Sequence, residues 1–237
     1  IAVGDAPAPT PPDYLGDPVK RGRIDATPEQ IATLDPLARK RNDAIARDTT
    51  ALANRDNART AFEADPSPAN QARLDRAEAE YSSAHTAMSK AAEKYGDNVA
   101  AEAAIRDHYP GATRIDLHGP ANGNHQFDQV WRTQDGRYVV VEAKSSTETR
   151  LGARNLPNGQ RVSQGTRDYF EDILNEMENR GMKAENQRDT IDGKDLVTEL
   201  RDSLEQDNLD YVVVHGAPNT GTYAGYKMKT FNIEAGS

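Results

Sequence analysis

Hydrophobic positions recur every seven residues in the segment from residue 67 to residue 95. Alanines fill a second position of the same repeat. This a/d pattern predicts a helix that packs along one side against another helix. The positions are Leu74, Tyr81, Met88 and Tyr95, with Ala77, Ala84 and Ala91 between them. A weaker seam precedes it at Ile31, Ala38, Ile45 and Leu52. The short D-P-S-P break at 65–68 favours an antiparallel helical hairpin over residues 27–94.

Signals for helix starts are dense before that break. Thr27 is followed by proline and, at the third helical position, by Gln30, which is a capping-box pattern. Asp35-Pro36 offers a second start. Residues 1–26 begin with five prolines in the first nineteen positions and are predicted to be an extended linker. The hairpin suits either a bracing element for the domain behind it, which we favour, or a docking or delivery module.

After Gly96 the pattern changes from helical spacing to alternation. Asp97 is expected to cap a helix that ends near Tyr109, before Pro110-Gly111. Strand-like segments follow at 112–118, 126–133 and 137–144, then helices at about 162–180 and 193–206, and strands at 209–215 and near 223–233. The fold class expected is therefore α+β (mixed α/β), with residues 95–237 forming one domain behind the hairpin.

Composition and charge narrow the chemistry. The 237 residues include no cysteine, which excludes disulfides, zinc-thiolate sites and a cysteine nucleophile. No run of 18 apolar residues is present, so no membrane anchoring is expected. The chain begins with Ile1 rather than Met, which suggests a fragment of a longer polypeptide. The net charge of −9 is uneven, because residues 150–167 carry four arginines and no acid, whereas residues 168–210 carry fourteen acids and five bases.

The strongest chemical signal lies on the predicted strand pair 126–133 and 137–144. If Gln134-Asp135-Gly136 is a three-residue loop with glycine in the left-handed conformation, paired residue numbers sum to about 270. Asp128 then lies opposite Glu142, with Lys144 on the same face. Opposed carboxylates repel unless a hard cation lies between them, and Mg²⁺ accepts this kind of ligand. The lysine could orient or deprotonate an attacking water.

This arrangement of Asp128 and Glu142-Ala143-Lys144, after a helix, resembles the PD-(D/E)xK nuclease superfamily over roughly residues 95–215. The resemblance implies a restriction-endonuclease-like αβββαβ core with a mixed central sheet. It also implies hydrolysis of phosphodiester bonds with Mg²⁺ or Mn²⁺, catalysed by Asp128, Glu142 and Lys144. Phe127 stands where the family name has proline, a position at which members vary.

Further residues are assigned roles by the same resemblance. Glu102, on the preceding helix, is expected to join Asp128 and Glu142 as a metal ligand. Gln164 is expected to contact the active site as in the Q-x-x-x-Y element, although Tyr169 follows it by five residues rather than four. The arginines beside this segment are expected to bind the phosphate backbone of nucleic acid. They are Arg150, Arg154, Arg161 and Arg167.

Within the superfamily, the segments G-N-H-Q-F-D-Q-V-W, V-V-V-E-A-K-S and V-S-Q-G-T-R-D-Y-F resemble C-terminal nuclease domains of bacterial polymorphic toxins. That resemblance implies a secreted effector that cuts DNA, with RNA as the alternative, in the cytoplasm of a target bacterial cell. Its partner would be a cognate immunity protein. Two other functions stay open: a housekeeping restriction or junction-resolving nuclease of the same fold, and a non-catalytic binding protein with a structural acid pair.

Overall fold

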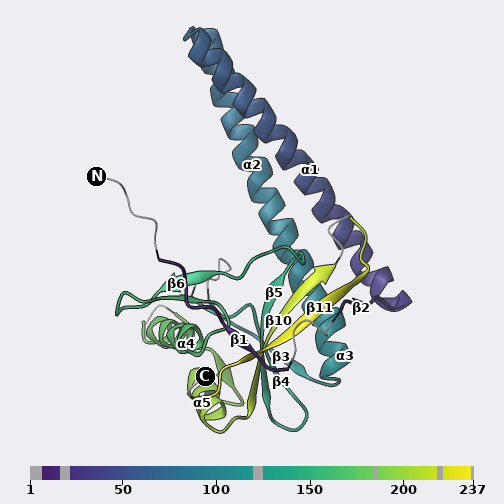
Figure 1. The fold of residues 1–237 in the computed structure, drawn as a ribbon, viewed down its shortest axis with the longest axis vertical. Helices are drawn as coiled ribbons and strands as arrows, with labels where there is room; N and C mark the ends of the chain where they lie inside the picture. Colours follow the sequence, from purple (N-terminus) through teal and green to yellow (C-terminus); the bar gives the residue numbers. More distant parts are fainter. Residues whose placement is uncertain (1–6, 17–21, 120–124, 184–185, 218–220, 236–237) are drawn as a thin grey trace.

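A central mixed sheet carries a long helical hairpin that extends away from it (Figure 1). The computed structural model describes residues 7–16, 22–119, 125–183, 186–217 and 221–235. Helices and parallel as well as antiparallel strands are present, so the expected α+β class is confirmed. Among the described residues, no helix combines the length and the apolar character that crossing a membrane requires.

The hairpin consists of α1 (Pro28–Ala64) and α2 (Pro68–Val99). The capping box is confirmed, because Thr27 Oγ1 accepts from the Gln30 amide and Gln30 Oε1 accepts from the Thr27 amide. Pro36 lies inside α1 and does not start a new helix. The seam in α1 also differs from the prediction, because Ile31 is exposed while alanines at 44, 51 and 58 are buried. Small residues there let the two helices approach closely.

The predicted helix start at Asp97 is wrong. The chain runs without a break from α2 into a π-helical segment, η1 (Ala100–Ile105), and a final turn, α3 (Arg106–His108). Gly96 therefore does not end a helix. A Cβ atom there would lie 3.1 Å from the backbone of Lys144 and Ser145, so this glycine lets the helix pack closely on the strand that carries Lys144.

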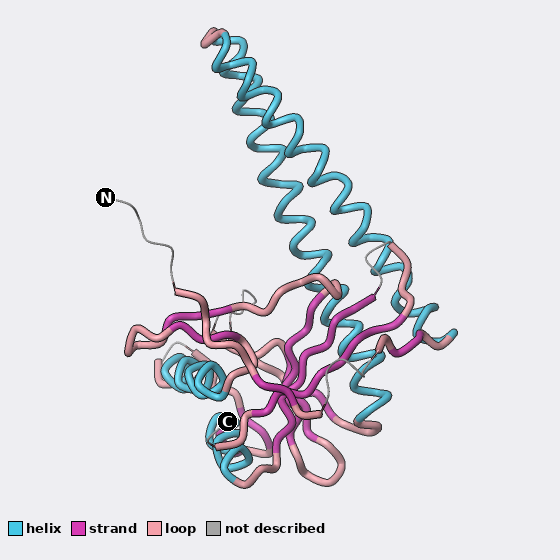
Figure 2. The backbone as a smooth tube through the Cα atoms, viewed as in Figure 1, coloured by secondary structure: helices cyan, strands magenta, loops and turns pink. Residues whose placement is uncertain are grey.

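The sheet order is β1-β11-β10-β5-β4-β3, with β2 also paired to β11. Only β5 and β10 run parallel among these pairs; the others are antiparallel. Figure 2 shows the strands crossing in the body below the hairpin. Their bounds are β1 (Asp13–Tyr14), β2 (Ile24–Asp25), β3 (Thr113–Ile115), β4 (Gln129–Arg132), β5 (Tyr138–Lys144), β10 (Leu209–Ala217) and β11 (Gly225–Asn232).

Two hydrophobic cores cover the two faces of this sheet. On one face, Val139 and Val141 of β5 pack with Tyr95 and Val99 of α2 and with η1. On the other face, alternate residues pack against α4 (Arg167–Gly181) and α5 (Leu196–Glu205). Because side chains alternate along a strand, Glu142 and Lys144 belong to the face that α4 and α5 cover.

Two small hairpins and the N-terminal segment complete the body. Residues 161–163, predicted in part as helix, form a strand, and α4 starts at Arg167 because Thr166 caps it. The proline-rich segment does more than link, since β1 and β2 extend the sheet beside β11. Residues 1–6 and 17–21 of that segment lie outside the described residues. The hairpins are β6 (Ala153–Asn155) with β7 (Arg161–Ser163), and β8 (Thr190–Ile191) with β9 (Lys194–Asp195).

Candidate active site

The register of the β4–β5 hairpin is the predicted one. Val130 pairs with Val140, Trp131 with Val139 and Arg132 with Tyr138, so paired numbers sum to 270. The loop is closed by the Gly136 amide, which donates to the Thr133 carbonyl at 3.0 Å, and Gly136 has φ +85°. This geometry requires glycine, since other residues rarely adopt a positive φ. The turn therefore determines which side chains of the two strands meet.

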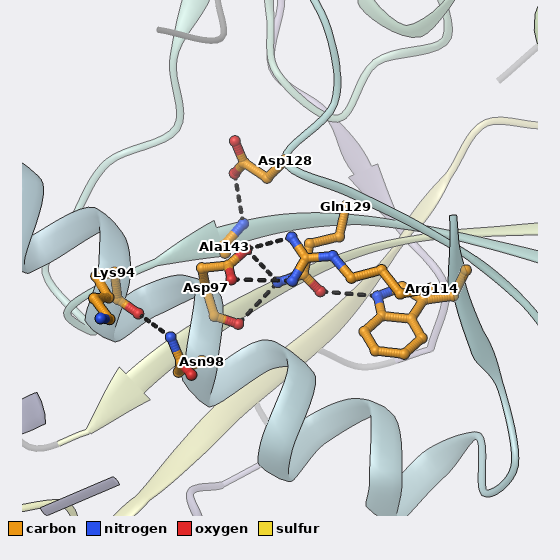
Figure 3. Close-up of polar contacts among 8 residues, drawn as sticks. Lys94, Asp97, Asn98, Arg114, Asp128, Gln129 and Ala143 are labelled. Carbon is orange, nitrogen blue, oxygen red and sulfur yellow. Dashed lines mark hydrogen bonds and ion pairs between the residues drawn. The ribbon is translucent and has the colours of Figure 1, made fainter. Parts of the chain in front are cut away.

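Asp128 directly precedes β4, and its carboxylate reaches the end of β5. The Ala143 amide donates to Asp128 Oδ2 at 2.8 Å (Figure 3). The carboxyl groups of Asp128 and Glu142 lie close enough for each to alter the pKa of the other. Asp128 stays accessible to solvent, although protein atoms crowd much of its carboxylate. The two acids thus lie on one face of the hairpin and touch, as the pairing arithmetic predicts.

Glu142 is only 2% exposed and is held by two donors. Tyr211 of β10 donates its hydroxyl to Glu142 Oε1 at 2.6 Å, and Gln164 donates Nε2 to Oε2 at 2.6 Å. Gln164 is itself fixed, since its Oε1 accepts from the Gly152 amide at 3.1 Å. These bonds set the orientation of the Glu142 carboxyl group and prevent it from turning away from Asp128.

Burial raises the pKa of Glu142 well above its usual value, and the neighbouring charge of Asp128 raises it further. The Tyr211 hydroxyl and the Lys144 ammonium oppose this shift only in part. Desolvation also raises the pKa of Asp128, against the Ala143 amide and Lys144. Ionising both acids is therefore costly in the protein alone, and a divalent cation between them would lower that cost.

Lys144 lies beside the pair and is half-buried, and its charge lowers the pKa of both acids. On the adjacent strand β10, His215 is the register partner of Lys144. His215 Nδ1 lies 3.0 Å from the Ser146 carbonyl oxygen. Because a carbonyl only accepts, Nδ1 carries the proton. Desolvation lowers the pKa of His215, and nearby lysines lower it further, so the ring is neutral near pH 7.

Glu102 is not brought to this site. It lies in η1, on the helical layer that covers the opposite face of the sheet, and forms an ion pair with Arg106 at 2.6 Å. Within the described ranges, no three His, Asp or Glu side chains gather closely enough to hold a metal ion. The nearest acid of α2 is Asp97, whose charge raises the pKa of Asp128. Asp97 is engaged by Arg114 at 2.7 Å and by Gln129 at 2.7 Å (Figure 3).

The four arginines expected to bind phosphate are placed differently from one another. Arg154 pairs with Asp172 at 2.7 Å and with Glu176 at 3.6 Å, and lies over the Tyr169 ring. Arg167 pairs with Glu171 at 2.8 Å and donates to the Ile233 carbonyl. Their charges are thus used inside the fold. Arg150 is exposed and Arg161 half-buried, and neither forms an ion pair with another described residue.

No protein-family model, curated protein or solved structure matches this chain. The geometry of the site is therefore the basis for inferring its chemistry.

Sequence reasoning missed two residues of the site, Tyr211 and His215, and left Tyr169 with no assigned role. Burial raises the pKa of Tyr169, and the charge of Glu142 raises it further, which places its ring near the acid pair. The alternation in Tyr211-Val212-Val213-Val214-His215 puts the first and last side chains on one face. The sequence does not indicate which strand pairs with β10. Its partner β5 runs parallel to it and is separated from it by a long segment of chain.

Asp128 and Glu142 fit a Mg²⁺ or Mn²⁺ ion. Mg²⁺ is usually held by one or two carboxylates, with waters and substrate phosphates completing its shell. Asp128 offers an accessible carboxylate with one backbone donor, and Glu142 supplies a second oxygen donor fixed in place. The Asp128 charge raises the pKa of Glu142, so positive charge between the two acids would relieve repulsion. A third carboxylate is not needed for this mode of binding.

The raised pKa of Glu142 predicts a pH-dependent stability in the absence of divalent cations. An acid whose pKa is higher in the folded than in the unfolded state destabilises the fold as pH rises above the unfolded value. The free energy of unfolding of Glu142→Gln, relative to the natural chain, should therefore increase from pH 5 to pH 8. Urea unfolding in EDTA at both pH values measures this difference. A difference that stays constant with pH would contradict the shift.

Proposed function

We propose that this protein is a metal-dependent nuclease that hydrolyses phosphodiester bonds, DNA being the favoured substrate and RNA the alternative. One observation carries the proposal. Asp128 and Glu142 meet on one face of a hairpin and interact with each other, with Lys144 on the same face. The charge of Asp128 raises the cost of ionising the buried Glu142, and a bound cation would offset that cost.

The chain's own residues account for orientation and charge at the reacting phosphate. Lys144 can stabilise the negative charge that develops on the phosphate or hold the attacking water. Gln164 and Tyr211 keep the Glu142 carboxyl group in one orientation. Bound Mg²⁺ would neutralise phosphate charge and acidify a water molecule. Water would add to phosphorus and lose a proton, one P–O ester bond would break, and the leaving oxygen would be protonated to a hydroxyl.

The experiment is incubation of the purified chain with supercoiled plasmid. Nicked and linear DNA should appear with Mg²⁺ or Mn²⁺ and not with EDTA. A parallel incubation with folded RNA separates the two substrates. Intact plasmid and RNA at all metal concentrations would reject the nuclease and favour the non-catalytic binding protein, in which Tyr211 and Gln164 hold a structural acid pair. Nicking only at particular junctions would favour the housekeeping enzyme.

The biological setting we propose is that of a toxin domain delivered into the cytoplasm of a competing bacterium, with an immunity protein as the neutralising partner. Support comes from the sequence resemblance and from the helical hairpin, which projects from the body (Figure 1). Expression in a bacterial host should arrest growth, whereas the Glu142→Gln variant should not. Equal growth with both proteins would contradict the role as a toxin, whereas the proposal of hydrolysis in vitro would still be tested by the plasmid assay.

A further inference from the structure

Basic side chains form a row across three adjacent strands beside the acid pair. Lys144 of β5 is the register partner of His215 of β10, and His215 is the partner of Lys227 of β11. Two residues along the strands, on the same face, Glu142 aligns with Val213 and then with Lys229. With strands about 4.8 Å apart, Lys144 and Lys227 are about 10 Å apart along the row.

All of these side chains point from one face of the sheet. On β11, Tyr226 and Met228 pack in the core on the α2 face, so the alternate residues Lys227 and Lys229 belong to the α4 face. Glu142 and Lys144 lie on that same face, because the neighbouring Val139 and Val141 pack in the α2-side core. The three lysines also lie close enough to His215 to interact with it, since Lys144, Lys229 and Lys227 each lower the pKa of His215.

The lysines of the row are available for a ligand. Lys227 is exposed, whereas Lys144 and Lys229 are half-buried. Within the described part of the chain none of them forms an ion pair with an acid, and Lys229 only lies over the Tyr14 ring, at 5.1 Å from its centroid. Arg154 and Arg167, by contrast, are neutralised by acids of α4. Basic charge without an acidic partner in the described residues therefore lies on β5 and β11 as well as at Arg150 and Arg161.

We propose that Lys144, Lys227 and Lys229 form a track that binds the phosphodiester backbone of nucleic acid and leads it to Asp128 and Glu142. This inference rests on the proposed function. A span of about 10 Å corresponds to about three nucleotides of a B-form strand. His215 lies in the middle of the track with its proton on Nδ1, so its neutral ring can only accept at Nε2. The contacts to phosphate oxygens come from the lysines.

Binding measurements on an inactive protein test the track. In the Glu142→Gln background, with EDTA, fluorescence anisotropy of labelled single-stranded DNA, duplex DNA and RNA is titrated at several KCl concentrations. Lys227→Gln combined with Lys229→Gln should weaken binding by about tenfold or more. It should also reduce the slope of log K against log salt by about 1.4 for single strands and about 1.8 for duplex DNA. The nucleic acid with the largest loss identifies the substrate.

The matched control is Lys40→Gln combined with Lys90→Gln, which makes the same change of charge on the helical hairpin, where both lysines are exposed. This control should keep the affinity and the salt slope of its parent. Equal losses in both double variants would overturn the track, because they would show a general effect of net charge. Binding to nucleic acid no tighter than to polyglutamate would overturn it too, since an acidic protein would then fit the row equally well.

Folding and the proposed reaction can be separated from the track. The single exposed substitution Lys227→Gln should give about half of the slope change with an unaltered unfolding midpoint. If plasmid is never cut with Mg²⁺ yet the double lysine variant loses binding, the track is supported and the proposed hydrolysis is rejected. If plasmid is cut and the double variant binds as its parent does, the track is rejected and the proposed hydrolysis is supported.

Discussion

Replacing Glu142 by glutamine, or Asp128 by asparagine, should reduce Mg²⁺-dependent plasmid cleavage by about 10³-fold or more. The two acids interact with each other and with Lys144 on this face of the sheet. Charge stabilisation by a bound metal ion is worth several kcal/mol, and each 1.36 kcal/mol changes the rate tenfold. Initial rates of nicking at saturating Mg²⁺ measure the effect.

The Glu142→Gln variant keeps the local structure, which makes its loss of activity interpretable. The introduced amide could accept from Gln164 with its oxygen and donate its NH₂ group to the Tyr211 hydroxyl oxygen, replacing the two bonds that Glu142 makes. Glu148→Gln is the control, since this exposed acid follows β5 closely and should leave cleavage unchanged. Cleavage by Glu142→Gln at the rate of the control would show that the acid pair is not the reaction centre.

The predicted parts of the fold are those decided by short stretches of chain. The Gln134-Asp135-Gly136 loop determined the register of its hairpin, because only a glycine readily takes φ +85° at that point. The capping box at Thr27 is local in the same way. The Gln134-Asp135-Gly136 loop alone was enough to predict that Asp128 meets Glu142 and on which face Lys144 lies.

Other features depend on contacts between distant segments and could not be predicted from the sequence. The change of pattern after Gly96 predicts a break between two helices, whereas the missing side chain of Gly96 lets one continuous helix pack on β5. Glu102 falls inside a π-helical segment, which shifts the phase of the side chains relative to a regular α-helix, so a periodicity of 3.6 could not place it. Tyr211 and His215 reach the site through a parallel pairing whose register no turn specifies.

The distribution of charge over the folded protein could not be predicted from the sequence either. The sequence separates a basic segment, residues 150–167, from an acidic one, residues 168–210, a pattern that is typical of interaction surfaces. In the fold, Arg154 and Arg167 instead pair with acids of α4, so much of that asymmetry cancels. Lys227 and Lys229, which are inconspicuous in the sequence, are brought beside Lys144 by the strand order β11-β10-β5. The track proposed above could be recognised only from that order.

A second large effect is expected at Gly165, the residue that follows Gln164. Gly165 has φ +95°, and a Cβ atom there would lie 2.2 Å from the Phe231 ring in the core between β11 and α4. Gly165→Ala should therefore lower the free energy of unfolding by about 2–5 kcal/mol, combining about 1–2 kcal/mol for the left-handed backbone with about 1–3 kcal/mol for overpacking. Urea unfolding of the purified variant measures this loss.

Gly159→Ala separates the two contributions. Gly159 has φ +83°, close to the value at Gly165, but no atom within 4 Å of the position its Cβ would take. It should lose only the backbone contribution of about 1–2 kcal/mol. Equal losses at the two glycines would show that the ring of Phe231 moves aside at no cost. If the clash instead shifts the backbone, Gln164 should leave Glu142, and the folded fraction of Gly165→Ala should cleave plasmid more slowly than Gly159→Ala. That result would tie the packing of β11 directly to the orientation of the acid pair.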